Sequence, residues 1–446
     1  SPAVGDVLKQ VKERMRGLPD KGAGYGLLRY LNPSTGPLLA TVSHPQIGFN
    51  YLGRFSSTMG AEAVAGADWS AAPEHPGLGG TQNPQQPHAH VVEINASAVE
   101  TPDGMCLQAS VSFPSEVVSE AAVQELIDVW REALSGLVRL VEQGGRGRTP
   151  SDFPLVSLTQ QQLAQLEETY PNLVDVLPLA PLQEGLLFHA VHQEEASGVY
   201  LVQFGLGLEG PLDSAALRRA LGDLLERHAN LKAGFHYEGL AEPVQVIPGP
   251  IEVPWREVDL SGLPESEQQT RLDALFKAYQ GIRFDPTRPP MVRFVLARLG
   301  PERHQLLFNT HHILLDGWSV PIIFSDLMAL YDAAAGGDSS LQPVRPFRDY
   351  LDWVRQQDRG DSHAAWRNAL AGLPEPTKLA AEDQNADPPL PEHLTSIFSA
   401  ELFHSMGELA RQQDVTTNTV IETAWALILR NLTGRSDVVF GRTVSG

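Results

Sequence analysis

The stretch of sequence that decides the fold is Asn309-Thr310-His311-His312-Ile313-Leu314-Leu315-Asp316-Gly317-Trp318-Ser319. An apolar run precedes it and predicts a strand that ends at the histidine pair. Successive side chains of a strand point to opposite faces, so His311 and His312 are not expected to face one site. We therefore expect one imidazole to face a cleft and the other to pack or hydrogen-bond inward. No further ligands stand at the spacing of a zinc site, so no metal is expected at the pair.

The residues after the pair predict a tight turn into a helix. Asp316 and Gly317 are expected to bring the carboxylate back toward the end of the strand, and Ser319 is expected to cap the next helix. A neutral imidazole beside a fixed backbone is suited to proton transfer near neutral pH. An isolated His-His pair at a strand end is more often structural than functional. The pattern around this pair changes that expectation.

The pattern His-His-x-x-x-Asp-Gly resembles the active-site motif of the condensation-domain superfamily, whose fold is similar to that of chloramphenicol acetyltransferase. Further blocks stand in the order of that family. They are Leu177-Pro178-Leu179-Ala180-Pro181-Leu182-Gln183-Glu184-Gly185-Leu186-Leu187-Phe188-His189, Arg227-His228-Ala229-Asn230-Leu231-Lys232-Ala233-Gly234-Phe235, Tyr350-Leu351-Asp352-Trp353, and the segment 437–446. The resemblance implies an α/β fold of two-layer lobes, with a near-complete N-terminal lobe at 175–358 and an incomplete C-terminal lobe at 359–446.

The resemblance also implies roles for the site residues. His312 is expected to take the proton of an amine or to hydrogen-bond the amine and the reaction intermediate. Gly317 is expected to leave room beside this ring, and its amide to help bind an oxyanion. Asp316 is expected to shape the turn through an ion pair with Arg227. The supporting residues are expected to be His311, Arg227 and Ser319.

The sequence upstream resembles a different member of the same superfamily. The segments 19–30 and 48–55 are similar to the late motifs of epimerization domains. Residues 1–143 are therefore expected to be the C-terminal part of such a domain, a second partial lobe. A polar, glycine-rich stretch then begins an interdomain linker at 144–174. The opening block of the second domain is similar to condensation domains whose donor ends in a D-residue.

The resemblance places Asn50 and Tyr51 at positions that line the epimerase site. The catalytic histidine and glutamate motifs of epimerization domains have no counterpart in this chain. Residues 1–143 are therefore not expected to epimerize a substrate. The ordinary interpretations of the two residues are a turn amide and a core tyrosine. A more speculative hypothesis is that 1–143 packs on 360–446 as a substitute half-lobe, but two incomplete domains side by side are favoured.

Composition narrows the class of protein. The net charge of −21 opposes nucleic-acid binding, which needs a basic surface. Cys106 is the only cysteine, which suits a reducing cytoplasm. The sequence contains no run of about 18 apolar residues, so no membrane span is predicted.

Hydrophobic periodicity predicts the regular elements. We expect a long loop at 59–90, helices at 7–18, 119–142, 158–168, 213–229, 265–281, 319–334, 346–357, 401–413 and 416–433, and strands at 90–98, 105–113, 199–208, 231–238, 243–248, 291–298, 304–311, 395–400 and 437–444.

The function implied by the resemblance is amide-bond formation in a nonribosomal peptide synthetase. A donor peptidyl thioester and an acceptor aminoacyl thioester are expected to arrive on the 4′-phosphopantetheine arms of upstream and downstream peptidyl carrier domains, beside an adenylation domain. No cofactor is expected to bind directly. Two alternatives remain open: an acyltransferase that uses coenzyme A, and a non-catalytic platform that docks carrier domains.

Overall fold

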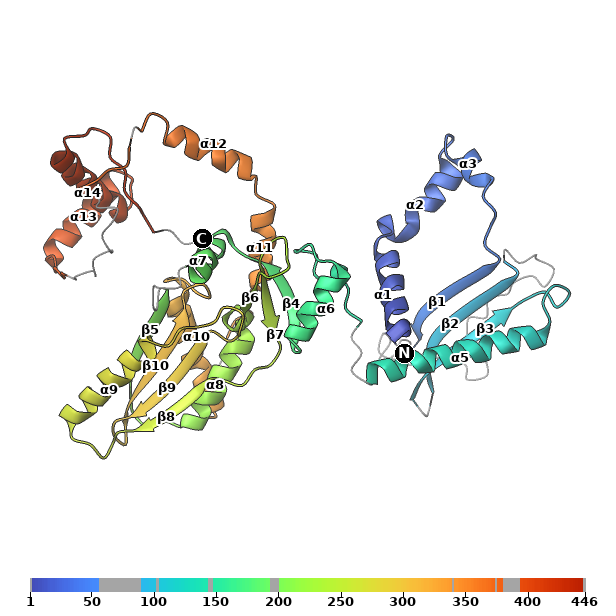
Figure 1. Cartoon of the computed structure of the whole chain (residues 1–446), viewed down its shortest axis with the longest axis horizontal. Coiled ribbons are helices and arrows are strands. Elements are labelled where there is room, and N and C mark those ends of the chain that lie inside the picture. Colours follow the sequence, from blue (N-terminus) through green and yellow to red (C-terminus); the bar gives the residue numbers. More distant parts are fainter. Residues whose placement is uncertain are drawn as a thin grey trace, which may run out of the picture. The chain divides into compact units, whose positions relative to one another are not determined.

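The computed structural model describes residues 2–55, 90–101, 104–142, 147–192, 200–338, 341–373, 375–379 and 394–443. It divides into two compact units, one ending at Pro154 and one beginning at Leu155 (Figure 1). The predicted loop at 59–90 lies almost wholly outside the described residues. No helix in the described segments combines the length and the apolar character needed to cross a membrane.

The first unit contains a small sheet and a long helix. Its elements are α1 (Pro2–Arg16), α2 (Ala23–Gly26), α3 (Gly36–Ala40), β1 (Ile47–Phe55), β2 (Val92–Thr101), β3 (Gly104–Ser112) and α5 (Glu120–Glu142), with single turns of tighter or wider helix at Pro19–Gly22, Leu27–Leu31 and Pro150–Asp152. The central strand β2 pairs in parallel with β1 and antiparallel with β3. The predicted helix at 119–142 is confirmed as α5. It meets the sheet where Trp130 lies edge-on to Phe49 of β1, with ring centroids 6.0 Å apart.

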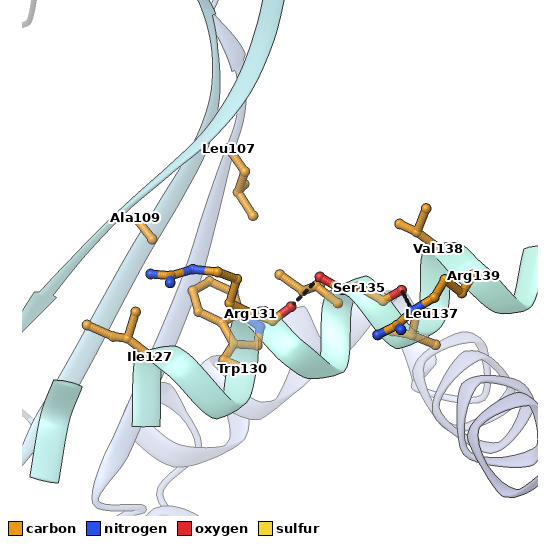
Figure 2. Close-up of a pocket in the computed structure, with 10 residues that line it drawn as sticks. Leu107, Ala109, Ile127, Trp130, Arg131, Ser135, Leu137, Val138 and Arg139 are labelled. Carbon is orange, nitrogen blue, oxygen red and sulfur yellow. Dashed lines mark hydrogen bonds between the residues drawn. The ribbon is translucent and has the colours of Figure 1, made fainter. Parts of the chain in front are cut away.

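The apolar side of α5 stays accessible in the described part of this unit. A hollow of about 840 Å³ lies between α5 and β3. Figure 2 shows Leu107 and Ala109 on the strand, with Ile127 and Trp130 on the facing helix. Leu107, which lines this hollow, is 51% exposed, so the described residues cover the apolar surface between α5 and β3 only in part.

Ion pairs and hydrogen bonds connect residues 147–152 to α1 within the first unit. Lys12 and Arg16 of α1 both pair with the carboxylate of Asp152. The Ser151 hydroxyl donates to Glu13 Oε1 over 2.6 Å. These contacts make the start of the predicted linker part of the first unit.

The second unit contains two sheets and most of the helices. Its elements are α6 (Gln160–Thr169), β4 (Leu173–Pro178), α7 (Pro181–His192), β5 (Leu201–Glu209), α8 (Ser214–Arg227), a 3-10 turn (Ala229–Lys232), β6 (Gly234–His236), β7 (Val244–Pro248), β8 (Trp255–Asp259), α9 (Glu265–Gln280), β9 (Val292–Arg298), β10 (Arg303–His311), α10 (Ser319–Ala334), α11 (Phe347–Arg355), α12 (Arg359–Ala369), α13 (Ala400–Gln412) and α14 (Thr417–Thr433). One sheet has the strand order β5-β10-β9-β8, and the other has the order β4-β7-β6 (Figure 1).

The strand that carries the histidine pair lies inside its sheet. β10 pairs antiparallel with both β5 and β9. Leu306, Leu307 and Phe308 are all buried, and Phe308 stacks on Phe294 of β9 with ring centroids 4.9 Å apart. Apolar residues on both faces of a strand are typical of one that is covered on both sides. β10 is therefore a rigid support for the residues at its end.

Two helices contribute to the same core. α8 begins at the cap residue Asp213, whose carboxylate accepts the amide of Ala216 over 3.0 Å. Its leucines are buried with residues of α10, β9 and β10 in one hydrophobic cluster. The contact between α8 and α10 thus connects the second sequence block to the helix that follows the histidine pair.

Residues 147–174, assigned from the sequence to a linker, divide between the two units. The predicted helix at 158–168 is present as α6, with Thr159 as its cap residue. Leu163 and Leu166 of this helix are 0% and 1% exposed. The Tyr170 hydroxyl donates to the carbonyl of Thr287 over 3.0 Å. Residues 155–174 are therefore an integral part of the second unit.

Two strand predictions are wrong, and a third is correct only in part. Residues 394–399 and 437–443 contain no strand, although strands were expected near 395–400 and at 437–444. Ile397 is 94% exposed and Phe398 is 74% exposed, so these apolar residues have no described strand or core to pack on. The strand expected at 231–238 begins only at Gly234, because the 3-10 turn occupies the residues before it.

Candidate functional site

The histidine pair stands at the end of β10, as the sequence predicts. His311 is the last residue of the strand, and His312 begins the turn. The backbone amide of His312 donates to the carbonyl of Tyr200 over 2.8 Å. Tyr200 immediately precedes β5 and has a φ of +67°, in the left-handed region that is rare for an aromatic residue. The start of β5 therefore fixes the backbone of His312.

His311 is directed inward. Its side chain is buried, and its Nδ1 accepts the backbone amide of Ile313 over 3.1 Å. Burial, with a smaller contribution from His312, lowers the pKa of His311 to about 4. The ring is therefore neutral at pH 7 with its proton on Nε2, and it stabilises the turn.

His312 lies in a more open environment. Its side chain is half-buried, and its Nδ1 is buried without a hydrogen-bond partner among the described residues. The Nε2 atom of the same ring is not buried in this way. The two rings thus differ in burial, and His312 does not belong to the residues that line the cavity beside the turn.

Asp316 and Ser319 interact, but not as expected. The Asp316 carboxylate accepts the backbone amide of Ser319 over 2.9 Å and its hydroxyl over 2.7 Å. Asp316 therefore closes the start of α10, whereas Ser319 is the first residue of the helix and not its cap. A carboxylate at this end of a helix is favoured because it satisfies free amides and the helix dipole. The carboxylate points toward the helix and not back toward the strand.

Gly317 is exposed at the tip of the turn. A Cβ built at this position would meet no atom within 4 Å. The described residues therefore do not require a glycine here for close packing.

The predicted ion pair between Arg227 and Asp316 is wrong. Arg227 Nε donates to Asp326 Oδ2 over 2.8 Å, and the same oxygen lies 2.8 Å from His228 Nε2. Another nitrogen of Arg227 donates to the carbonyl of Gln342 over 2.6 Å. Asp326 stands on the α10 face that packs on α8, whereas the carboxylate of Asp316 is used at the helix start. Arg227 therefore joins the two helices and supports the site from a distance.

A cavity of about 900 Å³ lies beside the turn. Leu315 and Ser319 line it from the turn, and His228 lines it from the end of α8. The wall opposite includes the stacked rings of Phe347, Tyr350 and Trp353. The fourth block of the sequence is thus brought to the same region as the second and third.

The two residues expected to line an epimerase site lie on β1 of the first unit. Asn50 is exposed, and its Nδ2 donates to Asn95 Oδ1 on β2 over 3.2 Å. Tyr51 is 55% exposed, so it is not a core tyrosine. Neither residue lines the hollow of Figure 2.

No cluster of three or more His, Cys, Asp or Glu side chains suited to a metal ion occurs among the described residues.

The sequence interpretation did not single out Gln183, Gln245, Tyr200 or Asp326 as site residues. Only Gln183 carried a signal, because it lies within the opening block.

Residues 174–446 match the profile of the family described as "Condensation domain". The chain belongs to the condensation domain family. The match covers more than half of the chain and includes the histidine pair, the turn and the cavity beside it. Residues of the first unit lie outside this profile.

Relatives of this condensation domain chain are very large proteins. One linear gramicidin synthase of Brevibacillus parabrevis is 34% identical over 455 residues, covering 100% of the chain and 8% of the relative. Bacitracin synthase 1 of Bacillus licheniformis is 30% identical over 451 residues, covering 99% of the chain and 8% of the relative. The chain thus spans only a small fraction of the length of these relatives.

Among solved structures, the starter condensation domain of rhizomide synthetase matches with a TM-score of 0.50 and 21% identity, over 62% of the chain and 61% of that domain. At this identity the likeness concerns the fold alone. The predicted α/β fold of the condensation domain type, similar to that of chloramphenicol acetyltransferase, is confirmed.

Proposed function

We propose that this condensation domain forms an amide bond within a nonribosomal peptide synthetase. The observation that carries the proposal is the different placement of the two histidines at the end of β10. His311 is neutral and engaged in the turn, while His312 is only half-buried and has a fixed backbone. Membership of the family and the similarity to gramicidin and bacitracin synthases support the same reaction.

The proposed reaction joins two tethered thioesters. The amine nitrogen of the acceptor attacks the carbonyl carbon of the donor thioester, so that a C–N bond forms and the C–S bond breaks. The amine loses one proton, and the departing thiolate gains one to become the thiol of its carrier arm. Since a thioester is already activated, positioning of the two substrates supplies a large part of the rate, on the order of 7–11 kcal/mol for well-oriented groups.

The role of His312 depends on which ring nitrogen carries the proton. A proton on Nε2 allows the ring to donate a hydrogen bond to the oxyanion of the tetrahedral intermediate. A proton on Nδ1 leaves Nε2 free to accept the amine proton. Nδ1 lacks a partner among the described residues in either tautomer, so the proposal includes both roles.

The substrates are proposed to arrive on 4′-phosphopantetheine arms of an upstream and a downstream peptidyl carrier domain, with an adenylation domain adjacent and the cytoplasm as the compartment. The donor is proposed to end in a D-residue. Two features of the sequence support this: the opening block at 177–189, and the likeness of residues 1–143 to the end of an epimerization domain. The similarity to linear gramicidin synthase extends over the whole chain and includes that segment.

The test compares His312→Ala with His363→Ala in the intact protein. His363 lies on α12 and is exposed, so it controls for loss of a histidine as such. Donor carriers loaded with D-ended or L-ended peptidyl thioesters are mixed with a loaded acceptor carrier, and the condensed product is measured by mass spectrometry. We expect His312→Ala to lower the rate by roughly 10²–10⁴-fold, with carrier binding unchanged. His312→Gln, which keeps a donor, should retain more activity than His312→Ala.

Each alternative has its own outcome. Full product formation by His312→Ala refutes the catalytic proposal. Product from a coenzyme A thioester, but not from the carrier-bound donor, indicates the acyltransferase alternative. Carrier binding without product in the unmodified protein indicates a docking platform. Equal rates with both donors remove the D-specific part of the proposal.

A further inference from the structure

We propose that Gln183 is a positioning residue, which acts with Gln245 to hold the turn that carries His312. The inference rests on the proposed function and adds residues that the catalytic motif does not include. Gln183 lies on α7 and Gln245 on β7, so both are remote in sequence from the turn at 311–316. Both side chains are buried, at 7% and 0% exposure.

The contact between Gln183 and the turn is direct. Gln183 Nε2 donates to the carbonyl of Ile313 over 3.0 Å. The carbonyl of Ile313 lies in the peptide unit between Ile313 and Leu314, so this bond fixes the backbone one residue beyond the candidate catalytic ring. The amide of the same residue donates to Nδ1 of His311, and the amide of His312 donates to the carbonyl of Tyr200. Two contacts from elsewhere in the second unit, from α7 and from the residue before β5, and one bond within the turn therefore fix the backbone on both sides of His312.

Gln183 cannot easily adopt another orientation, because its own polar atoms are all engaged. Its Oε1 accepts the amide of Ala180 over 2.9 Å and Nε2 of Gln245 over 2.9 Å. Its Nε2 also lies 3.3 Å from Gln245 Oε1, so the two amides pair reciprocally. Gln245 in turn donates to the carbonyl of Pro178 over 2.7 Å. Rotating either amide by half a turn would place donor against donor and acceptor against acceptor.

Core packing alone does not account for this arrangement. A buried amide pair is retained only when its hydrogen bonds are satisfied, and an apolar pair of similar shape fills the same volume. Here one end of the pair is joined to α7 and β4, and the other end to the catalytic turn. The backbone near His312 is thus hydrogen-bonded through the amide pair to the β4-β7-β6 sheet, so the sheet determines where this backbone lies.

The test uses Gln183→Met, which keeps the length of the side chain and removes its hydrogen bonds. We expect kcat for condensation to fall by about 100-fold with KM for the carriers little changed, since small displacements of a catalytic group have effects of this size. The matched control is Gln268→Met on α9. Gln268 is also buried and donates to three carbonyls, those of Leu260, Leu263 and Leu299, away from the turn. It should lower thermal stability to a similar extent and leave kcat near the unmodified value.

A second variant keeps the inference testable where Gln183→Met does not fold. In Gln183→Glu the side chain can donate to the carbonyl of Ile313 only when the carboxyl is protonated. Burial raises the pKa of such a carboxyl. The rate of Gln183→Glu relative to the unmodified protein should therefore rise as pH falls, which a purely structural residue does not produce.

The inference fails if Gln183→Met keeps full kcat, if Gln268→Met lowers kcat as much as Gln183→Met does, or if the relative rate of Gln183→Glu is independent of pH. These results are separate from failure of the proposed function, which is judged by His312→Ala in the same assay. A large loss in His312→Ala together with no loss in Gln183→Met refutes the positioning role alone.

Discussion

Replacement of Asp326 by Asn tests how α8 and α10 are held together behind the site. Asp326 Oδ2 lies 2.8 Å from both Arg227 Nε and His228 Nε2, and the three side chains are only 12–20% exposed. Hydrogen bonds to charged groups contribute about 1.5–3 kcal/mol each. Because some solvent reaches the cluster, we take the lower figure for each of the two bonds. Asparagine keeps one neutral oxygen as an acceptor and loses the charge, so Asp326→Asn should destabilise the α8–α10 contact by about half of this sum, about 1.5 kcal/mol.

Hydrogen exchange measured by mass spectrometry can follow this contact separately from the first unit. Amides at the end of α8 and in the middle of α10 should exchange roughly tenfold faster in Asp326→Asn, because about 1.4 kcal/mol corresponds to a factor of ten. The control is Asp332→Asn on the same helix, whose side chain is exposed. That substitution should change the exchange by less than about threefold.

The lowered pKa of Asp326 determines how the stabilisation of the α8–α10 contact changes with pH. Burial acts to raise the pKa of Asp326, but the hydrogen bonds from Arg227 and His228 outweigh it and hold the pKa below its usual range. A lowered pKa in the folded state means that the stabilisation is present above the ordinary value of about 3.8 and is lost as pH falls through the folded value. The difference between the unmodified protein and Asp326→Asn should therefore be present at neutral pH and shrink below about pH 4. Equal exchange in the two proteins at neutral pH would refute the reasoning.

Three further substitutions probe other parts of the two units. Phe308→Ala should lower the free energy of unfolding of the second unit by about 3–5 kcal/mol, measured by denaturant titration, because it removes a fully packed ring from the central strand. Asp316→Ala should fray the first turn of α10 at a cost of about 1 kcal/mol, seen as faster amide exchange at Ser319, and normal protection there would count against its capping role. In the first unit, burial raises the pKa of Asp152, but its hydrogen bonds, Lys12 foremost, lower it well below its usual range. Asp152→Asn should therefore speed exchange in α1 at neutral pH, and this effect should disappear in acid as the natural carboxylate is protonated.

The sequence predicts the centre of the second unit well. The apolar run before the histidine pair forms β10, and the leucine periodicity of 213–229 and the apolar pattern of 319–334 form α8 and α10. These elements bury their own apolar residues, so a local pattern is enough to predict them. The end of the strand at the histidine pair is also predicted locally, whereas the placement of His312 depends on the turn that follows.

The contacts that connect distant segments could not be predicted in the same way. Arg227 was expected to pair with Asp316, and its pairing with Asp326 instead depends on how α8 and α10 pack. The bond from Gln183 to Ile313 spans 130 residues of sequence. The strands expected near 395–400 and 437–444 were inferred from the local pattern of apolar residues, but a strand also needs a neighbour with free backbone groups. Short β8 was missed because its side chains are largely exposed and carry charges.

The position of α6 matters to anyone who recombines peptide synthetases. A cut placed at residue 174, where the family profile begins, would give a condensation-domain fragment without the buried Leu163 and Leu166 of α6. It would also lose the hydrogen bond from the Tyr170 hydroxyl to the carbonyl of Thr287. A junction between Pro154 and Leu155 keeps α6 in the same fragment as the rest of the second unit, on which it packs. The same junction keeps Asp152 in one fragment with its partners on α1. Chimeric enzymes joined there should express in a better folded state than those joined twenty residues later.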